Sequence, residues 1–262
     1  MIENDLLDPD KIIANLNTKR IGKKILVYNS TSSTNDIAVE YATNKRNDGL
    51  AIFAEEQAAG RGRAGAKWIS GRADSILCSI VLTKTQCSAE LLSLTLAVAV
   101  AEAVGEIGGK SAKIKWPNDI ILNGKKVAGI LLESKNYNGH SIYILGIGIN
   151  CHQEKDSFPP DLRTLATSID IESKTICDRV SLAKRLLASI DHWLEIAEKN
   201  STEVIDHWRK LSIQLSHRVN LIFNGRKFAG NCIGIDPENG LLLQLDTGGV
   251  RMFDAAHTAI VK

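Results

Sequence analysis

The stretch Glu55–Trp68, EEQAAGRGRAGAKW, contains three glycines in the spacing G-x-G-x-x-G: Gly60, Gly62 and Gly65. This spacing marks a dinucleotide-binding Rossmann domain only where a strand precedes the glycines and a helix begins on them, because the pyrophosphate lies at that helix N-terminus. The residues that follow, 66–82, contain Gly71 and then a β-like apolar run. They offer no acidic residue at a distance that suits a ribose. The sequence therefore argues against a Rossmann domain.

The same glycines do not form a phosphate-binding P-loop either. A P-loop ends in Gly-Lys followed by Ser or Thr, whose hydroxyl binds the metal ion. Here Ala66 separates Gly65 from Lys67, and Trp68 occupies the position of the hydroxyl. The stretch is therefore predicted to be a connection between two strands.

Arg61 and Arg63 determine what this connection can bind. Glycines let the backbone approach a ligand closely, and consecutive N–H groups can surround an anion. Arginine adds a planar fork of donors that suits carboxylate or phosphate. Two interpretations stay open from these residues alone: an anion-binding loop, or a solvated hairpin tip whose arginines serve solubility.

The composition is that of an ordinary globular protein. Of the 262 residues, 44% are hydrophobic and 24% are charged, and the formal net charge of +2 does not suggest a nucleic-acid-binding protein. The five cysteines are scattered without a C-x-x-C pair, which argues against a disulfide framework or a zinc site and for a reducing compartment. The N-terminal residues lack the apolar core of a signal peptide, and the most apolar run, 91–104, is short for a membrane span. We expect a cytoplasmic protein without membrane contact.

Hydrophobic patterning divides the chain near residue 214. Before that residue, apolar strands alternate with helical segments, which indicates a mixed α/β domain. Residues 215–262 are short alternating strands broken by Asn-Gly and Gly-Gly turns, which is typical of a small β-barrel or sandwich. In the first part we expect strands at 23–30, 49–56, 74–82 and 141–151, a hairpin that turns at Asn123-Gly124, and helices after STSSTND (30–36), at 89–108 and over 178–212.

KWPND, residues 115–119, is a second unusual cluster. Pro117 interrupts the strand, so Asn118 and Asp119 lie at an irregular point where side chains can face a cleft. An amide beside a carboxylate is a partial ligand set for magnesium with bound phosphate. The alternative is a bulged turn in which both side chains cap backbone groups.

Three further positions have both a structural and a functional interpretation. Lys126 adjoins an apolar strand, Asn150 ends the glycine-broken strand GIGIN (146–150), and STSSTND supplies hydroxyls at a helix start. The structural interpretation is a solvated edge lysine for Lys126, a polar strand end for Asn150 and a helix cap for STSSTND. The glycine spacing in GIGIN suggests a close approach of a ligand to the backbone. The sequence has no G-x-S-x-G or other nucleophile motif.

Taken together and in order, five motifs resemble those of the biotin protein ligases. They are STSSTN (30–35), EEQAAGRGRAGAKW (55–68), KWPNDIIL (115–122), KKVAGILLE (125–133) and GIGIN (146–150). The resemblance is strong over residues 25–152 and extends through the C-terminal module, which looks like the SH3-like domain of that family. The ordered set is far more specific than any single motif.

The resemblance implies both a fold and an activity. The fold would be α/β (α+β), with a mixed sheet flanked by helices as in class II aminoacyl-tRNA synthetases over residues 1–214, and an SH3-like β-barrel over 215–262. Enzymes of this family use ATP, biotin and magnesium (Mg²⁺) to form biotinyl-5′-adenylate and pyrophosphate. They then transfer biotin to one lysine of the biotin carboxyl carrier domain of a carboxylase. Neither step needs a protein nucleophile.

The resemblance also implies roles for individual residues. Arg63 and Lys126 would be catalytic, and the loop that contains Arg61, Gly62 and Arg63 would order over biotin and the adenylate. The expected biotin-binding residues are Ser33, Thr34, Asn35, Gln57, Arg61, Gly62, Arg63 and Lys126. The expected residues for ATP and the adenylate are Gly60, Gly65, Trp68, Lys115, Asn118, Asp119 and Asn150, with Asn118 and Asp119 also facing the metal ion.

Two features differ from many members of that family. Ala66 stands where a further basic residue is common, with Lys67 beside it. About thirty residues precede STSSTN, too few for the winged-helix DNA-binding domain of the bifunctional repressors, so we expect no direct DNA binding. Homodimerisation is an expectation from the resemblance alone. The alternatives are a lipoate or octanoate ligase and, from another class, a nucleic-acid-binding regulatory module, against which the near-neutral charge argues.

Overall fold

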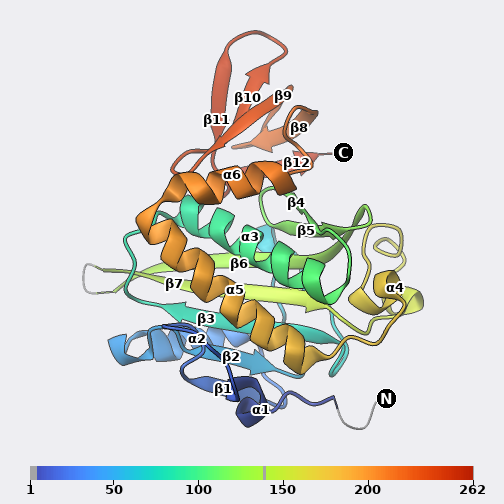
Figure 1. Ribbon diagram of the computed structural model, residues 1–262. Coiled ribbons are helices and arrows are strands. Elements are labelled where there is room, and N and C mark those ends of the chain that lie inside the picture. Colours follow the sequence, from blue (N-terminus) through green and yellow to red (C-terminus); the bar gives the residue numbers. More distant parts are fainter. Residues whose placement is uncertain (1–4, 138–139, 262) are drawn as a thin grey trace.

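The computed structural model describes residues 5–137 and 140–261, and its largest element is a seven-stranded mixed sheet (Figure 1). The strand order is β1-β2-β3-β7-β6-β5-β4. β1 and β2 are parallel, and the other neighbours are antiparallel. The strands are β1 (Ile25–Tyr28), β2 (Ala51–Ala54), β3 (Ser75–Leu82), β4 (Lys113–Lys115), β5 (Asp119–Leu122), β6 (Lys125–Tyr137) and β7 (His140–Asn150).

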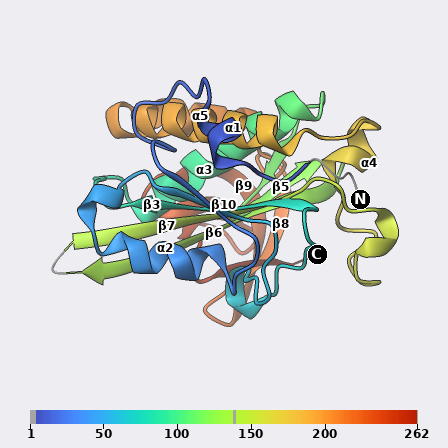
Figure 2. The ribbon, with the colours of Figure 1, turned by 90° about the horizontal axis from the view of Figure 1, so that it is seen from below.

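Helices cover both faces of this sheet (Figure 2). α3 (Ala89–Ile107) and α5 (Arg179–Lys199) lie on one face, and α2 (Thr34–Ala42) lies on the other. α3 is buried over most of its surface because it contacts the sheet, α5 and α6 (Ser201–Leu211) together. Within the described part of the chain, no helix is both long enough and apolar enough to cross a membrane.

A five-stranded antiparallel sheet follows α6 and stands above it in Figure 1. Its order is β11-β10-β9-β8-β12, and its strands are β8 (Arg218–Phe223), β9 (Arg226–Asp236), β10 (Gly240–Leu245), β11 (Val250–Phe253) and β12 (Thr258–Val261). Alternate residues of β8 and β10, among them Val219, Leu221, Leu241 and Leu243, are buried as the period of a strand requires. The predicted fold class, a helix-flanked mixed sheet followed by a small SH3-like β module, is confirmed.

The predicted elements are observed with small differences at their ends. The expected helical region 178–212 consists of two helices, α5 and α6, because Asn200 between them has φ −153° and ψ 86° and is not helical. The prediction omits two five-residue helices, α1 (Pro9–Ile13) and α4 (Ile169–Ser173). Helices this short have too few residues for an apolar period to be recognised.

Candidate active site

The glycine-rich connection joins the antiparallel strands β2 and β3, as the sequence predicts. Its tip folds back on itself: Trp68 N donates to Gly60 O at 3.0 Å, and Gly62 N donates to Ala66 O at 2.7 Å. The reversal occurs at Ala64 and Gly65, which have φ of 52° and 78°. The only helical element within residues 60–68 is a 3₁₀ turn over Arg63–Gly65. We call residues 60–68 the glycine-rich loop.

Two cavities lie beneath and beside the glycine-rich loop. The smaller has a volume of about 250 Å³ and the larger of about 1200 Å³. All eight residues expected to bind biotin line the smaller cavity: Ser33, Thr34, Asn35, Gln57, Arg61, Gly62, Arg63 and Lys126. Six of the seven residues expected to bind the nucleotide line the larger cavity: Gly60, Gly65, Trp68, Lys115, Asn118 and Asp119. Lys67 lines both cavities.

Thr34 and Asn35 of α2 form a hydrogen-bonded network with Gln57 and Ser79 beside the smaller cavity. Gln57 Oε1 accepts hydrogen bonds from Thr34 N at 2.7 Å and Thr34 Oγ1 at 3.1 Å. Ser79 Oγ lies 2.7 Å from Thr34 Oγ1 and 2.5 Å from Asn35 Oδ1. Ser33 occupies the N-cap position of α2, but its side chain makes no capping bond. These hydroxyl and amide groups are therefore oriented by one another rather than by simple helix capping.

Arg61 forms ion pairs at the rim of this cavity. Arg61 Nη2 lies 2.7 Å from Asp36 Oδ1 and 3.5 Å from Glu133 Oε2. The hydrogen bond from Arg61 holds the pKa of Asp36 below its ordinary value. Glu133 Oε2 also accepts from Asn35 Nδ2 at 2.6 Å. The sequence reasoning missed Glu133 as a site residue, although it ends the KKVAGILLE motif.

Trp68 lines both cavities, and Lys126 lies beside its ring in the smaller one. The Trp68 ring lies against Gly129 and Gly148, which face each other across β6 and β7. A Cβ atom on Gly148 would be 2.5 Å from Trp68 Cε2, so this surface requires glycine. Lys126 Nζ lies 5.8 Å from the Trp68 ring centroid and 2.6 Å from Asp119 Oδ1. The close approach predicted from the glycines of GIGIN is thus observed, with an indole as the neighbour.

Arg63 connects the glycine-rich loop to the second sheet. Its guanidinium donates to Asn118 Oδ1 at 3.3 Å, to Thr258 O at 3.2 Å and to Ala255 O. Burial lowers the pKa of Arg63. The larger cavity is also lined by Ile222 and residues 256–260. No local motif in the sequence indicates this contribution, because Ala255 and Thr258 lie 192 and 195 positions after Arg63 in the chain.

Asn150 is the one expected site residue that lines neither cavity. Its side chain is buried, and Nδ2 donates to Thr167 O at 3.0 Å. The segment around Leu165 and Thr167 pairs with the backbone of Lys126 and covers the end of β7. The structure therefore gives Asn150 a backbone partner instead of a position in the cavities.

Comparison with known proteins gives the same family as the motifs. The model of the biotin/lipoate A/B protein ligase family matches residues 27–150. The chain is 31% identical over 253 residues to the bifunctional ligase/repressor BirA of Bacillus spizizenii, covering 95% of this chain and 78% of that protein. It is 29% identical over 262 residues to the biotin–[acetyl-CoA-carboxylase] ligase of Mycobacterium tuberculosis, covering 95% of each.

A solved structure agrees with these relatives. The biotin protein ligase from Aquifex aeolicus in complex with biotin and ATP matches with a TM-score of 0.77 and 26% identity, covering 92% of this chain and 99% of that one. The chain belongs to the biotin/lipoate A/B protein ligase family. The Mycobacterium tuberculosis relative and the Aquifex aeolicus structure are both named as biotin ligases, and the resemblance inferred from the five motifs is confirmed.

Proposed function

We propose that the chain is an ATP-dependent biotin–protein ligase that forms biotinyl-5′-adenylate and transfers biotin to a lysine of a biotin carboxyl carrier domain. The observation that carries this proposal is the lining of the smaller cavity, which contains all eight residues expected to bind biotin. The adjoining larger cavity contains basic and amide groups suited to a nucleotide. Two adjoining cavities that share lining residues suit a reaction between a small carboxylate and ATP.

In this proposal the smaller cavity holds the ring system of biotin. Thr34, Asn35 and Gln57 hydrogen-bond the ureido group, because their hydroxyl and amide groups offer both donors and acceptors. Trp68 and the glycine surface beneath it give an apolar wall for the rest of the ligand. A pocket of few, fixed polar groups in apolar surroundings favours one ligand orientation.

Lys126 and Arg63 would act on the reacting groups. An oxygen of the biotin carboxylate attacks the α-phosphorus of ATP, the bond from phosphorus to the bridging oxygen breaks, and pyrophosphate leaves. Because two anionic groups approach each other, fixed positive charge lowers the barrier. Lys126 lines the smaller cavity, where it can bind the carboxylate, and Arg63, which lines both cavities, can bind the phosphate from the glycine-rich loop.

Asn118 and Asp119 present oxygen groups of the kind that magnesium binds, and in the structure these oxygens pair with Arg63 and Lys126, from which an ion would have to take them. In the part of the chain that the structure describes, no group of three or more His, Cys, Asp or Glu side chains could form a metal site. One carboxylate and one amide oxygen suit an ion that takes most of its ligands from phosphate and water. Asp119 and Asn118 would hold such an ion, which supplies additional positive charge next to the phosphates.

The second step requires an acyl-adenylate that is shielded from water until the carrier arrives. The carrier's lysine amine attacks the acyl carbon, and AMP leaves. Closure of the glycine-rich loop would provide the shielding. We also propose that the enzyme forms a homodimer, an expectation that rests on family resemblance.

The test is transfer of labelled biotin to a purified carrier domain in the presence of ATP and magnesium. We expect protein-bound label, and pyrophosphate release that depends on biotin. Thermal stabilisation by lipoate or octanoate but not by biotin would identify a lipoate ligase instead. Salt-dependent DNA binding without biotin-dependent pyrophosphate release would contradict the enzyme proposal altogether.

A further inference from the structure

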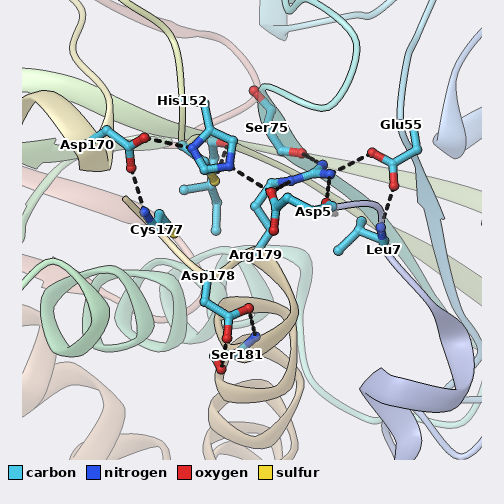
Figure 3. Close-up of polar contacts among 12 residues, drawn as sticks. Asp5, Leu7, Glu55, Ser75, His152, Asp170, Cys177, Asp178, Arg179 and Ser181 are labelled. Carbon is cyan, nitrogen blue, oxygen red and sulfur yellow. Dashed lines mark hydrogen bonds and ion pairs between the residues drawn. The ribbon is translucent and has the colours of Figure 1, made fainter. Parts of the chain in front are cut away.

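Arg179, the first residue of α5, is a fully buried charged side chain that lines neither cavity. Figure 3 shows its guanidinium among three groups of acceptors. Nε donates to Asp5 Oδ2 at 2.7 Å, Nη1 donates to Ser75 O at 3.0 Å, and Nη2 donates to Glu55 Oε2 at 2.8 Å. A buried positive charge is stable only when acceptors surround it, and each of the three guanidinium nitrogens of Arg179 donates to one.

Two of these partners are the ends of the connection that carries the glycine-rich loop. Glu55 directly follows β2, and Ser75 is the first residue of β3, so residues 56–74 span the distance between them. Glu55 O also accepts from Ala73 N at 3.0 Å, which closes the base of the connection. Arg179 therefore bridges the point where the chain leaves the sheet and the point where it returns.

The N-terminal segment completes this bridge. Leu7 N donates to Glu55 Oε1 at 2.6 Å, so both oxygens of the buried Glu55 carboxylate are bound. The backbone carbonyl of Asp5 accepts a second hydrogen bond from Arg179. Asp5 Oδ2 lies 2.8 Å from His152 Nε2, just beyond the end of β7. The network thus joins segments that are far apart in the sequence at one end of the sheet (Figure 3).

We propose that Arg179 is a positioning residue for the glycine-rich loop: by fixing Glu55 and Ser75 it holds the base from which the loop closes over the two cavities. This inference rests on the proposed function, because the loop's task there is to retain the adenylate. A small displacement at the base moves the loop tip and the groups it presents to the ligand. Lysine cannot replace the arginine, since one ammonium group does not reproduce a planar fork with several fixed acceptors.

Arg20 provides a matched control at the opposite ends of the same two strands. Arg20 Nε donates to Asp48 Oδ2 at 2.7 Å, and Nη2 donates to Lys84 O at 2.5 Å. Asp48 precedes β2, and Lys84 follows β3. Arg20→Lys therefore disturbs a fork of the same kind beside the same strands without touching the base of the loop.

The experiment compares Arg179→Lys and Arg20→Lys with the unaltered chain. It measures the melting temperature, trypsin cleavage within the glycine-rich loop of the ligand-free protein, and release of preformed biotinyl-adenylate. We expect both variants to melt earlier. Only Arg179→Lys should accelerate cleavage and release, each by roughly tenfold, the factor that corresponds to one hydrogen bond to a charged group.

Equal effects of the two variants on cleavage and release, or no effect of Arg179→Lys on either, would overturn the inference. If Arg179→Lys does not fold, Asp5→Asn takes its place, since it removes only a charge at the edge of the network. Unchanged loop cleavage in Asp5→Asn would then count against the inference. Failure of the unaltered chain to form an adenylate would contradict the proposed function, whereas cleavage of the ligand-free loop still tests the role of Arg179.

Discussion

Replacing His152 by glutamine is expected to remove a loss of stability at alkaline pH. His152 Nε2 lies 2.8 Å from Asp5 Oδ2, and Nδ1 lies 2.7 Å from Asp170 Oδ2. These hydrogen bonds raise the pKa of His152 from 6.5 to about 9, although burial acts in the opposite direction. The hydrogen bond with Asp5 makes the largest contribution. The other charged group at this site is Arg179, which shares Asp5. Only the protonated ring can donate to both carboxylates.

The size of the effect follows from proton linkage. Between pH 6.5 and about 9, folded His152 keeps a proton that the unfolded chain releases. The stabilisation is therefore complete below pH 6.5 and is lost as the pH rises through 9. At about 1.4 kcal/mol for each pH unit, the loss in the free energy of unfolding approaches about 3 kcal/mol. That is a large fraction of the roughly 5–15 kcal/mol that stabilises an ordinary domain.

Urea unfolding at about pH 6 and about pH 9.5 measures this difference. The comparison includes His152→Gln and a control, His257→Gln, whose side chain is 60% exposed in the unaltered protein. We expect the unaltered chain and the control to lose about 3 kcal/mol more than His152→Gln between the two pH values. The same pH dependence in all three proteins would refute the reasoning.

Three further predictions concern the cavities. Arg63→Ala should release biotinyl-adenylate about tenfold faster, because the glycine-rich loop loses an anion-binding guanidinium. The control Arg72→Ala, on the same connection, should release it at the unaltered rate. Equal release rates for the two variants would contradict the role of Arg63. Lys126→Ala should slow single-turnover adenylation by about 10²-fold or more, with Lys125→Ala as the control, and unaltered adenylation would exclude the assigned role. Gly148→Ala should lower the affinity for biotin by about tenfold in calorimetric titration, because the added Cβ displaces Trp68. The control Gly234→Ala should bind biotin normally, because no atom lies within 4 Å of its added Cβ.

The fold was predictable where the hydrophobic pattern is long and continuous. Residues 74–82 give an uninterrupted apolar run, and β3 is buried along its whole length. The helix expected at 89–108 is observed as α3, Ala89–Ile107. The prediction of one helix overlooked Asn200 because the apolar spacing continues from α5 into α6, although Asn200 followed three residues later by Glu203 is the spacing of a helix N-cap.

The candidate site was predictable to the extent that it is built from local motifs. The residues expected to bind biotin gather in one cavity because the start of α2, the glycine-rich loop and the strands β3, β6 and β7 meet there. Asn150 shares a strand face with Gly146 and Gly148 by alternation, yet the segment that ends at Thr167 covers it. The parts contributed by residues 256–260 and by Arg179 have no local signal, because tertiary contacts over long sequence distances create them.

The contact of Arg63 with the second sheet has a consequence for folding. Arg63 meets carbonyl groups 192 and 195 positions later in the chain. Contacts of such large sequence separation close a loop of roughly three quarters of the polypeptide, and contacts of this kind form slowly. The larger cavity is lined by residues from both sheets, so it cannot be complete until both sheets are in place. During refolding, secondary structure is therefore regained before the nucleotide-sized cavity exists.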